Sequence, residues 1–177
     1  CAVVFEELGR APLPGPYFSS GVLGALTVLQ GGSEEQKRSW LPRICSSESI
    51  VTMAISDAHL GWGPETVEMR GTRASGEVVV SGSKAFVHDV DDATALICAA
   101  RLEPDTSRVT LLLVDKAALG VSVHPLDGFL ASVAEVRFDS VHVLESNILG
   151  EIGAGWEILD QALEKAIPIL CAYQVGA

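Results

Sequence analysis

Two short stretches of the sequence carry side chains that could bind a ligand. In the first, Trp62 stands between Gly61 and Gly63, and an indole ring can stack on a flat ligand or plug a site. In the second, His88 closes the run Lys84–His88; its imidazole can donate a hydrogen bond, and its charge varies near neutral pH. By itself this histidine is equally typical of a protein surface, so residue types alone allow a binding site without defining one.

The remaining reactive groups give weaker signals. Ser56-Asp57 follows the apolar run Met53 to Ile55, which by itself indicates a strand that ends in a turn. The four cysteines lie far apart and form no C-x-x-C pair, so we expect buried thiols in a reducing, cytoplasmic compartment, with a disulfide or a metal site as the alternatives. These four are Cys1, Cys45, Cys98 and Cys171. We predict no metal site.

Composition narrows the class of protein. The 177 residues carry 12 Lys+Arg and 23 Asp+Glu, a net charge of −11, which argues against a nucleic-acid partner. The charge is uneven: residues 1–88 hold 7 basic and 9 acidic groups, and residues 89–177 hold 5 and 14. Any pyrophosphate-bearing ligand should therefore favour the first half. An apolar content of 48% argues against disorder, and no run approaches the roughly 18 apolar residues of a membrane span.

The first third of the chain is predicted to be helical. Apolar patterns indicate helices over residues 1–10 and 18–30, and Ser33 with Gln36 forms a capping box that begins a third helix, disturbed at Pro42. The residues expected to point inward from the first helix are Val3, Val4 and Leu8.

After residue 49 the hydrophobic period changes to that of strands. Short β-branched runs are separated by Gly, Pro, Asp and Ser, and residues 134–138 alternate apolar and charged, which indicates a compact antiparallel barrel or sandwich. The runs are Ile50–Ile55, Val78–Val80, Ala95–Ala99, Val109–Val114 and Val121–Val123. Beyond Gly153–Gly155 the helical period returns, with an expected kink at Pro168. Helices, then strands, then a helix make an α+β fold.

Three ordered segments resemble the acyl-CoA dehydrogenase family of flavoproteins. They are Gly32-Ser33-Glu34-Glu35-Gln36-Lys37 with Trp40-Leu41-Pro42; Val80-Ser81-Gly82-Ser83-Lys84-Ala85-Phe86-Val87; and Val136–Val143 with Asn147–Gly150 and Gly153–Trp156. The resemblance implies the end of an N-terminal helical domain (1–48), an antiparallel β-barrel middle domain (49–150) and the first helix of a C-terminal helical bundle (151–177). It also implies that the chain is incomplete.

In that family FAD accepts a hydride from an acyl-CoA while a carboxylate removes the neighbouring proton. The resemblance implies that the strand ending at Ser56 forms hydrogen bonds to the edge of the flavin. It also implies that Phe86 lies against the flavin ring and that His88 lies near flavin N5. Trp62 would also touch the acyl-CoA substrate. The full set of implied cofactor-binding residues is Met53, Ile55, Ser56, Gly61, Trp62, Phe86, Val87 and His88.

The sequence also departs from the family. Trp62 and Gly63 stand where the family has a serine and an aspartate near the cofactor phosphates, so this loop is either adapted or degenerate. His59 is expected to be a loop histidine. Ala166 falls where some members carry the catalytic glutamate, and Ile167 falls near a family arginine. We therefore assign no catalytic residue within the chain.

The resemblance favours an FAD-dependent α,β-dehydrogenase of acyl-CoA in fatty acid metabolism. The departures keep a second hypothesis open, a non-catalytic or half-site partner subunit of a heteromeric enzyme. A β-barrel module that binds another small hydrophobic ligand is a third. The implied partners are an acyl-CoA substrate, further copies or homologues in a homo- or hetero-oligomer, and an electron-accepting flavoprotein; transfer to oxygen, as in related oxidases, also stays open.

Overall fold

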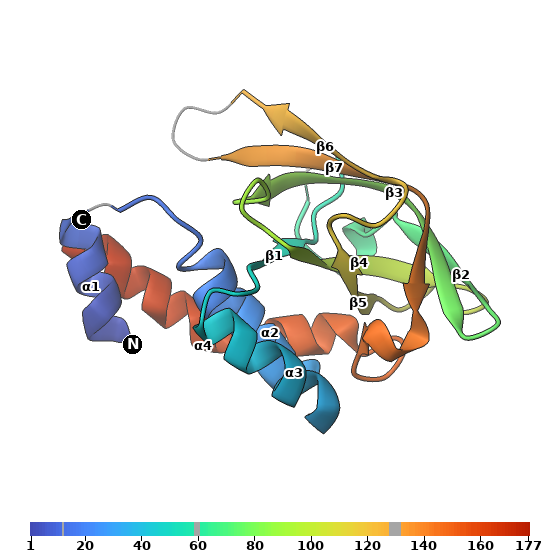
Figure 1. The fold of residues 1–177 in the computed structure, drawn as a ribbon, viewed down its shortest axis with the longest axis horizontal. Coiled ribbons are helices and arrows are strands. Elements are labelled where there is room, and N and C mark those ends of the chain that lie inside the picture. The colour runs from blue at the N-terminus through green and yellow to red at the C-terminus, as the bar shows by residue number, and fades with distance from the viewer. Residues whose placement is uncertain (12, 59–60, 128–131) are drawn as a thin grey trace.

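The computed structural model describes residues 1–11, 13–58, 61–127 and 132–177. It shows a helical layer packed against one side of a curled eight-stranded sheet, with β6 and β7 on the far side from the helices (Figure 1). The helices are α1 (Ala2–Arg10), the π-helical turn η1 (Ser19–Gly24), α2 (Ala25–Gly31), α3 (Glu34–Cys45) and α4 (Gly155–Gly176), with short 3₁₀ turns η2 (Pro64–Thr66) and η3 (Glu145–Asn147). The strands are β1 (Val51–Ala54), β2 (Arg70–Ala74), β3 (Glu77–His88), β4 (Ala95–Leu102), β5 (Thr110–Asp115), β6 (Val121–Leu126), β7 (Val133–Leu144) and β8 (Ile148–Leu149).

The sheet runs in the order β6-β7-β3-β2-β4-β5-β8, with β1 added beside β4. Most pairs are antiparallel, while β4 pairs in parallel with both β1 and β2. The alternation of side chains in β4 explains how one strand serves two cores. Leu96 and Cys98 point into the core enclosed by the sheet, whereas Ala95 and Ile97 point toward the helices. The predicted α+β fold is confirmed.

The capping box predicted at Ser33 is also present. The Ser33 side chain accepts from the Gln36 backbone, and the Gln36 side chain accepts from the Ser33 backbone. Helix α3 continues through Pro42, and α4 runs from Gly155 to Gly176 with Pro168 inside it, so neither proline ends its helix.

Two expectations about burial were wrong. In α1 the buried residues are Phe5 and Gly9, and Leu8 packs beside them as predicted, while Val3 and Val4 are exposed because the face that packs on α4 is turned away from these valines. Of the four cysteines, which all lie in the described part of the chain and are free, only Cys98 is buried. The other three stand on helices or at the chain start, outside the sheet core.

One strand is longer than its apolar run predicted, and another strand was not predicted. Strand β3 extends from Glu77 to His88, well beyond the apolar run at residues 78–80, and β2 (Arg70–Ala74) carries two arginines and no β-branched aliphatic residue. In the described part of the chain, no helix combines the length and apolar character that a membrane crossing needs.

Candidate functional site

Six of the eight predicted cofactor-binding residues line one cavity of about 250 Å³, which we name the rim cavity. It lies where the end of β1 and the end of β3 meet η1 and α4. The six are Met53, Ile55, Ser56, Trp62, Phe86 and His88, joined by Leu23, Ala85, Leu159 and Leu163. Residues more than 100 positions apart in the chain are thus gathered by the contact of β1 and β3 with the helical layer.

The β1 side of the cavity is held by main-chain and side-chain hydrogen bonds. Beyond the last residue of β1, the Ser56 carbonyl accepts from the Ala85 backbone N–H at 2.8 Å, which continues the contact between the two segments. Behind Met53, the buried Thr27 hydroxyl lies 3.9 Å from the methionine sulfur and donates to the Leu23 carbonyl at 2.8 Å. This wall is therefore fixed to both the sheet and the helices.

On the β3 side, a bulge turns the strand. The pairing of β3 with β7 shifts register between Lys84 and Val87, and Phe86 takes a left-handed backbone conformation with φ of 55°. A non-glycine residue in this region is held there by its surroundings. The bulge leaves the Phe86 ring 47% exposed at the cavity while Val87 packs into the sheet core, so Val87 does not line the cavity.

His88 ends the same strand. Its side chain is exposed and lines the cavity, and its carbonyl accepts from the Thr52 hydroxyl at 2.7 Å. The hydrogen bond ties the end of β3 to β1, and so holds the two walls of the cavity at a fixed separation.

The Trp62 loop forms the outer wall. Trp62 is 61% exposed, and its ring centroid lies 5.4 Å from that of Trp156 at the start of α4, with the rings tilted by 58°. The indole therefore borders the cavity without filling it. Gly61 is exposed beside it and does not line the cavity, and His59 lies outside the described residues.

The loop is anchored by Arg101, which donates to the carbonyls of Pro64 and Thr106 at 2.6 Å and of Val67 at 2.7 Å. Within the loop, Gly63 has φ of 150°, and a Cβ added there would lie 2.2 Å from the Glu65 carboxylate. A negative charge thus occupies the space beside the glycine where the family resemblance would place phosphate contacts.

Directly behind the cavity wall lies a buried ion pair that the sequence analysis missed. Lys84 is 0% exposed and Asp57 5% exposed, and their Nζ and Oδ2 atoms are 2.9 Å apart. Desolvation lowers the pKa of Lys84 even though pairing with Asp57 opposes it, and desolvation raises the pKa of the buried Cys98 thiol to about 12. A lysine in the otherwise small or apolar stretch Ser83 to Val87 was the available signal.

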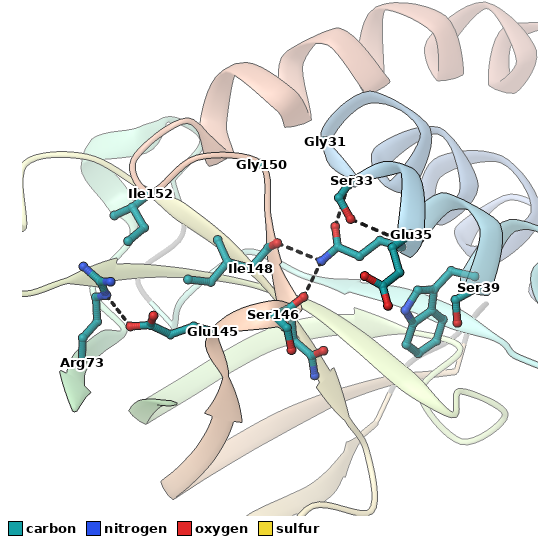
Figure 2. Close-up of a pocket in the computed structure, with 14 residues that line it drawn as sticks. Gly31, Ser33, Glu35, Ser39, Arg73, Glu145, Ser146, Ile148, Gly150 and Ile152 are labelled. Atoms are coloured by element: carbon teal, nitrogen blue, oxygen red, sulfur yellow. Dashed lines mark hydrogen bonds and ion pairs between the residues drawn. The ribbon is translucent and has the colours of Figure 1, made fainter. Parts of the chain in front are cut away.

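A second and larger cavity, of about 660 Å³, lies between α3 and the turn before β8; we name it the α3 cleft (Figure 2). The Gln36 amide donates to the carbonyls of Ser146 and Ile148 at 2.8 and 2.9 Å, and at the far end Arg73 pairs with Glu145 at 2.8 Å. Gln36 thus joins the helical layer to the chain at η3 and β8, and the Arg73–Glu145 pair joins β2 to η3.

Comparison with known proteins agrees with the fold. Residues 1–48 match the family "Acyl-CoA dehydrogenase, N-terminal domain". Over 142 residues the chain is 28% identical to an acyl-CoA dehydrogenase of Bacillus subtilis, covering 77% of this chain and 38% of that protein.

Solved structures match nearly the whole chain. The steroid ACAD Tcur3481-Tcur3483 is 28% identical with a TM-score of 0.90, covering 97% of this chain and 46% of that one. A glutaryl-CoA dehydrogenase from Mycobacterium smegmatis in complex with FADH2 shares the fold at 20% identity and a TM-score of 0.88, covering 99% of this chain and 46% of that one.

In fold and in these sequence matches the chain is similar to the acyl-CoA dehydrogenases. The chain is a relative of that family, as its three ordered segments predicted, and it spans less than half the length of each of these three proteins.

Proposed function

We propose that the protein is an FAD-dependent oxidoreductase that introduces an α,β double bond into an acyl-CoA thioester. The observation that carries the proposal is the convergence of Met53, Ile55, Ser56, Trp62, Phe86 and His88 on the rim cavity. The family resemblance assigns these residues to the flavin from the sequence alone, independently of any contact between them.

The lining of the rim cavity suits the ring of a flavin. Two aromatic side chains, Trp62 and Phe86, offer flat faces, and the Ser56 hydroxyl and the His88 imidazole offer hydrogen bonds at one edge. The apolar side chains of Leu159 and Leu163 complete the wall. A flat heterocycle with polar atoms along one side fits this set of donors and apolar surfaces.

In the reaction, the chemistry that the flavin supplies when bound is acceptance of the hydride from the β carbon of the thioester. Ser56 and His88 would donate hydrogen bonds to the ring edge, where negative charge develops. Phe86 and Trp62 would hold the plane of the ring and exclude water from the reacting carbons. These are roles in binding and orientation.

Removal of the α proton needs a base, and the described residues that line the rim cavity carry no carboxylate. Ala166, at a position where the resemblance places some members' glutamate, is fully buried against Phe5 and Val22. We therefore propose that the base comes from outside this set of residues.

A second candidate function rests on the Gly63 loop and Ala166. Trp62 and Gly63 replace the serine and the aspartate that the resemblance places near the cofactor phosphates, and a buried alanine replaces a possible base. Both features suit a half-site partner subunit in a heteromeric acyl-CoA dehydrogenase. The matched steroid ACAD is named for two components, Tcur3481 and Tcur3483, which agrees with such an assembly in that protein.

Both candidates include oligomers and an electron-accepting flavoprotein partner. Both also keep the expected division into an N-terminal helical domain over residues 1–48, a barrel domain over residues 49–150 and a C-terminal helix over residues 151–177.

The two candidates separate in one experiment. Purified protein is loaded with FAD, and a panel of acyl-CoA thioesters is added without oxygen while the flavin absorbance is followed. Loss of the oxidised-flavin bands together with formation of the enoyl-CoA supports the dehydrogenase. Bound flavin that no thioester reduces, with reduction restored by a co-purified homologue, supports the partner subunit. Absence of flavin binding contradicts the dehydrogenase, and fewer flavins than chains in a complex with a co-purified homologue supports the partner subunit; a homo-oligomer with one FAD per chain contradicts the partner subunit.

A further inference from the structure

The ion pair between Lys84 and Asp57 has no assigned role, and it lies directly behind the rim cavity. Lys84 Nζ donates to the Ile55 carbonyl at 3.1 Å and to Asp57 Oδ2 at 2.9 Å. The same Oδ2 accepts from the Glu68 backbone N–H at 2.9 Å. One ammonium therefore bonds to both residues that flank Ser56 in the chain.

Besides the two bonds from Lys84 to its neighbours, a third hydrogen bond holds Ser56 itself through its backbone. Its carbonyl accepts from the N–H of Ala85, the residue that follows Lys84 on β3. Successive residues of β3 thus hold successive residues of the Ile55–Asp57 segment. Because these contacts fix the main chain on both sides of Ser56, they determine how its hydroxyl stands at the cavity.

The β3 bulge depends on the same contacts. Ala85 and Phe86 lie inside the register shift between Lys84 and Val87, where the strand leaves its regular pairing with β7. Lys84 is turned inward to full burial while Phe86, two residues on, is exposed at the cavity. In an unbulged strand two residues of this spacing would share one face. The same bulge therefore allows Lys84 to be buried and Phe86 to be exposed.

Stability alone does not explain why this pair is buried. Taking both charges out of water is unfavourable, and well-packed apolar residues of similar volume often serve a core as well or better. The groups that face the Lys84 ammonium are Asp57, Cys98 and Glu68, so Asp57 is its only buried carboxylate among them. A fixed geometry for the segment beside Ser56 is a role that apolar packing could not supply.

We infer that Lys84 is a positioning residue: paired with Asp57, it fixes the Ile55–Asp57 segment against β3 and so sets the placement of Ser56 and Phe86 in the rim cavity. The inference rests on the proposed function for its link to FAD. The pair touches neither the flavin nor the substrate, and it acts through the residues that do.

The test uses the double variant Lys84→Met/Asp57→Asn in the purified protein. Methionine keeps the apolar stem, and asparagine keeps an oxygen that accepts from Glu68 N–H, so no unpaired charge is left buried. The matched control is Arg73→Gln/Glu145→Gln, which removes an ion pair at the α3 cleft that is far more exposed.

Three quantities are compared: amide hydrogen exchange at Ala85, the Kd for FAD, and the absorption spectrum of bound flavin. We expect Ala85 to exchange at least tenfold faster in the double variant, the Kd for FAD to rise at least tenfold, and the flavin bands to shift. The control variant should change none of these. Asp57→Glu, which keeps the charge pair but moves its oxygen, should show the same changes at a few-fold size, and it replaces the double variant if that variant does not fold.

Unchanged exchange at Ala85 would overturn the positioning role, whatever happens to FAD. Faster exchange with an unchanged Kd for FAD would overturn the link to the cofactor. If the unaltered protein binds no FAD, the proposed function fails separately, and exchange at Ala85 still decides whether the pair fixes the segment.

Discussion

The rim cavity and the α3 cleft both lie where the helical layer meets the sheet, yet they are built in opposite ways. In the α3 cleft two polar side chains of the lining bond to other lining residues: Gln36 donates to the carbonyls of Ser146 and Ile148, and Arg73 pairs with Glu145. At the rim cavity the polar support, Lys84 and Asp57, is buried behind the wall, and aromatic and small polar side chains line the opening.

The difference shows that cavity size is a poor guide to a binding site. The α3 cleft has more than twice the volume of the rim cavity, about 660 against 250 Å³, but its Gln36 and Arg73 side chains are engaged in holding elements together. A ligand entering the cleft would have to replace these bonds. The smaller cavity presents its ring faces and side-chain donors to a ligand directly, which is what flat cofactors require.

The largest expected difference in stability between the two regions comes from breaking their ion pairs, Lys84–Asp57 behind the rim cavity and Arg73–Glu145 at the α3 cleft. Lys84→Ala leaves the Asp57 charge buried, so we expect the free energy of unfolding to fall by about 3–5 kcal/mol. Arg73→Ala breaks an exposed pair and should cost about 1 kcal/mol or less. Urea unfolding of both variants checks this, and equal losses would mean that the two pairs do not differ as their burial indicates.

The next effect belongs to the α3 cleft. Gln36→Ala removes two hydrogen bonds to the turn before β8 and half of the capping box at Ser33. At about 1 kcal/mol for each of these three net hydrogen bonds, we expect a loss of roughly 3 kcal/mol in unfolding free energy. The Kd for FAD should stay within about twofold of its original value. A weakening of flavin binding as large as that of rim variants would make the cleft part of the cofactor site.

Phe86→Leu should change the free energy of unfolding less than Lys84→Ala or Gln36→Ala does, but it should weaken FAD binding more than Gln36→Ala does. The ring is half exposed, so the variant should unfold within about 1 kcal/mol of the original protein. Loss of the stacking face should weaken FAD binding about tenfold, which corresponds to roughly 1.4 kcal/mol. Leu29→Ala, at an exposed position on α2, is the matched surface control and should leave the Kd unchanged.

The smallest effect is a pH dependence with two opposing parts. The folded-state pKa of Cys98 is raised from 9.0 to about 12, so its contribution to stability is complete below pH 9 and is lost as the pH rises toward 12. The folded-state pKa of Lys84 is lowered from 10.5, so the unfolded chain binds more protons between that lowered value and 10.5, and stability rises with pH there.

Each group contributes a slope of at most about 1.4 kcal/mol per pH unit, and the two slopes have opposite signs. Above pH 9 the free energy of unfolding should therefore fall less steeply with pH in Cys98→Ala than in the original protein, and just below pH 10.5 it should fall more steeply in Lys84→Met. Identical pH profiles in all three proteins would contradict the burial of both groups.

Local chemistry made part of the molecule predictable. The capping box at Ser33 and the apolar strands β4 and β5 follow from neighbouring residues, so their positions were expected. Strand β2 was not, because Arg70 and Arg73 hide a segment that pairing with β3 and β4 makes a strand. Val3 and Val4 were predicted to point inward because they are apolar, but they are exposed. Their residue type does not determine which face of α1 packs against α4.

The candidate site was predictable only where a motif preserved it. The residues around Ser56 and Phe86 were found through the family resemblance. The Lys84–Asp57 pair was missed because its partners are 27 positions apart, and a charged residue is normally expected at the surface. The contact of Trp62 with Trp156 likewise depends on the packing of α4 against the loop, which no local pattern encodes.

The central proposal is that the rim cavity, lined by Trp62 and Phe86, binds a flavin ring, and titration of the purified protein with FAD tests it most directly. Flavin fluorescence and tryptophan fluorescence are followed together in the unaltered protein and in Phe86→Leu. We predict saturable quenching of both signals, with an affinity about tenfold lower in the variant. Free-flavin spectra throughout, or saturable binding that Phe86→Leu leaves unaltered, would contradict the account.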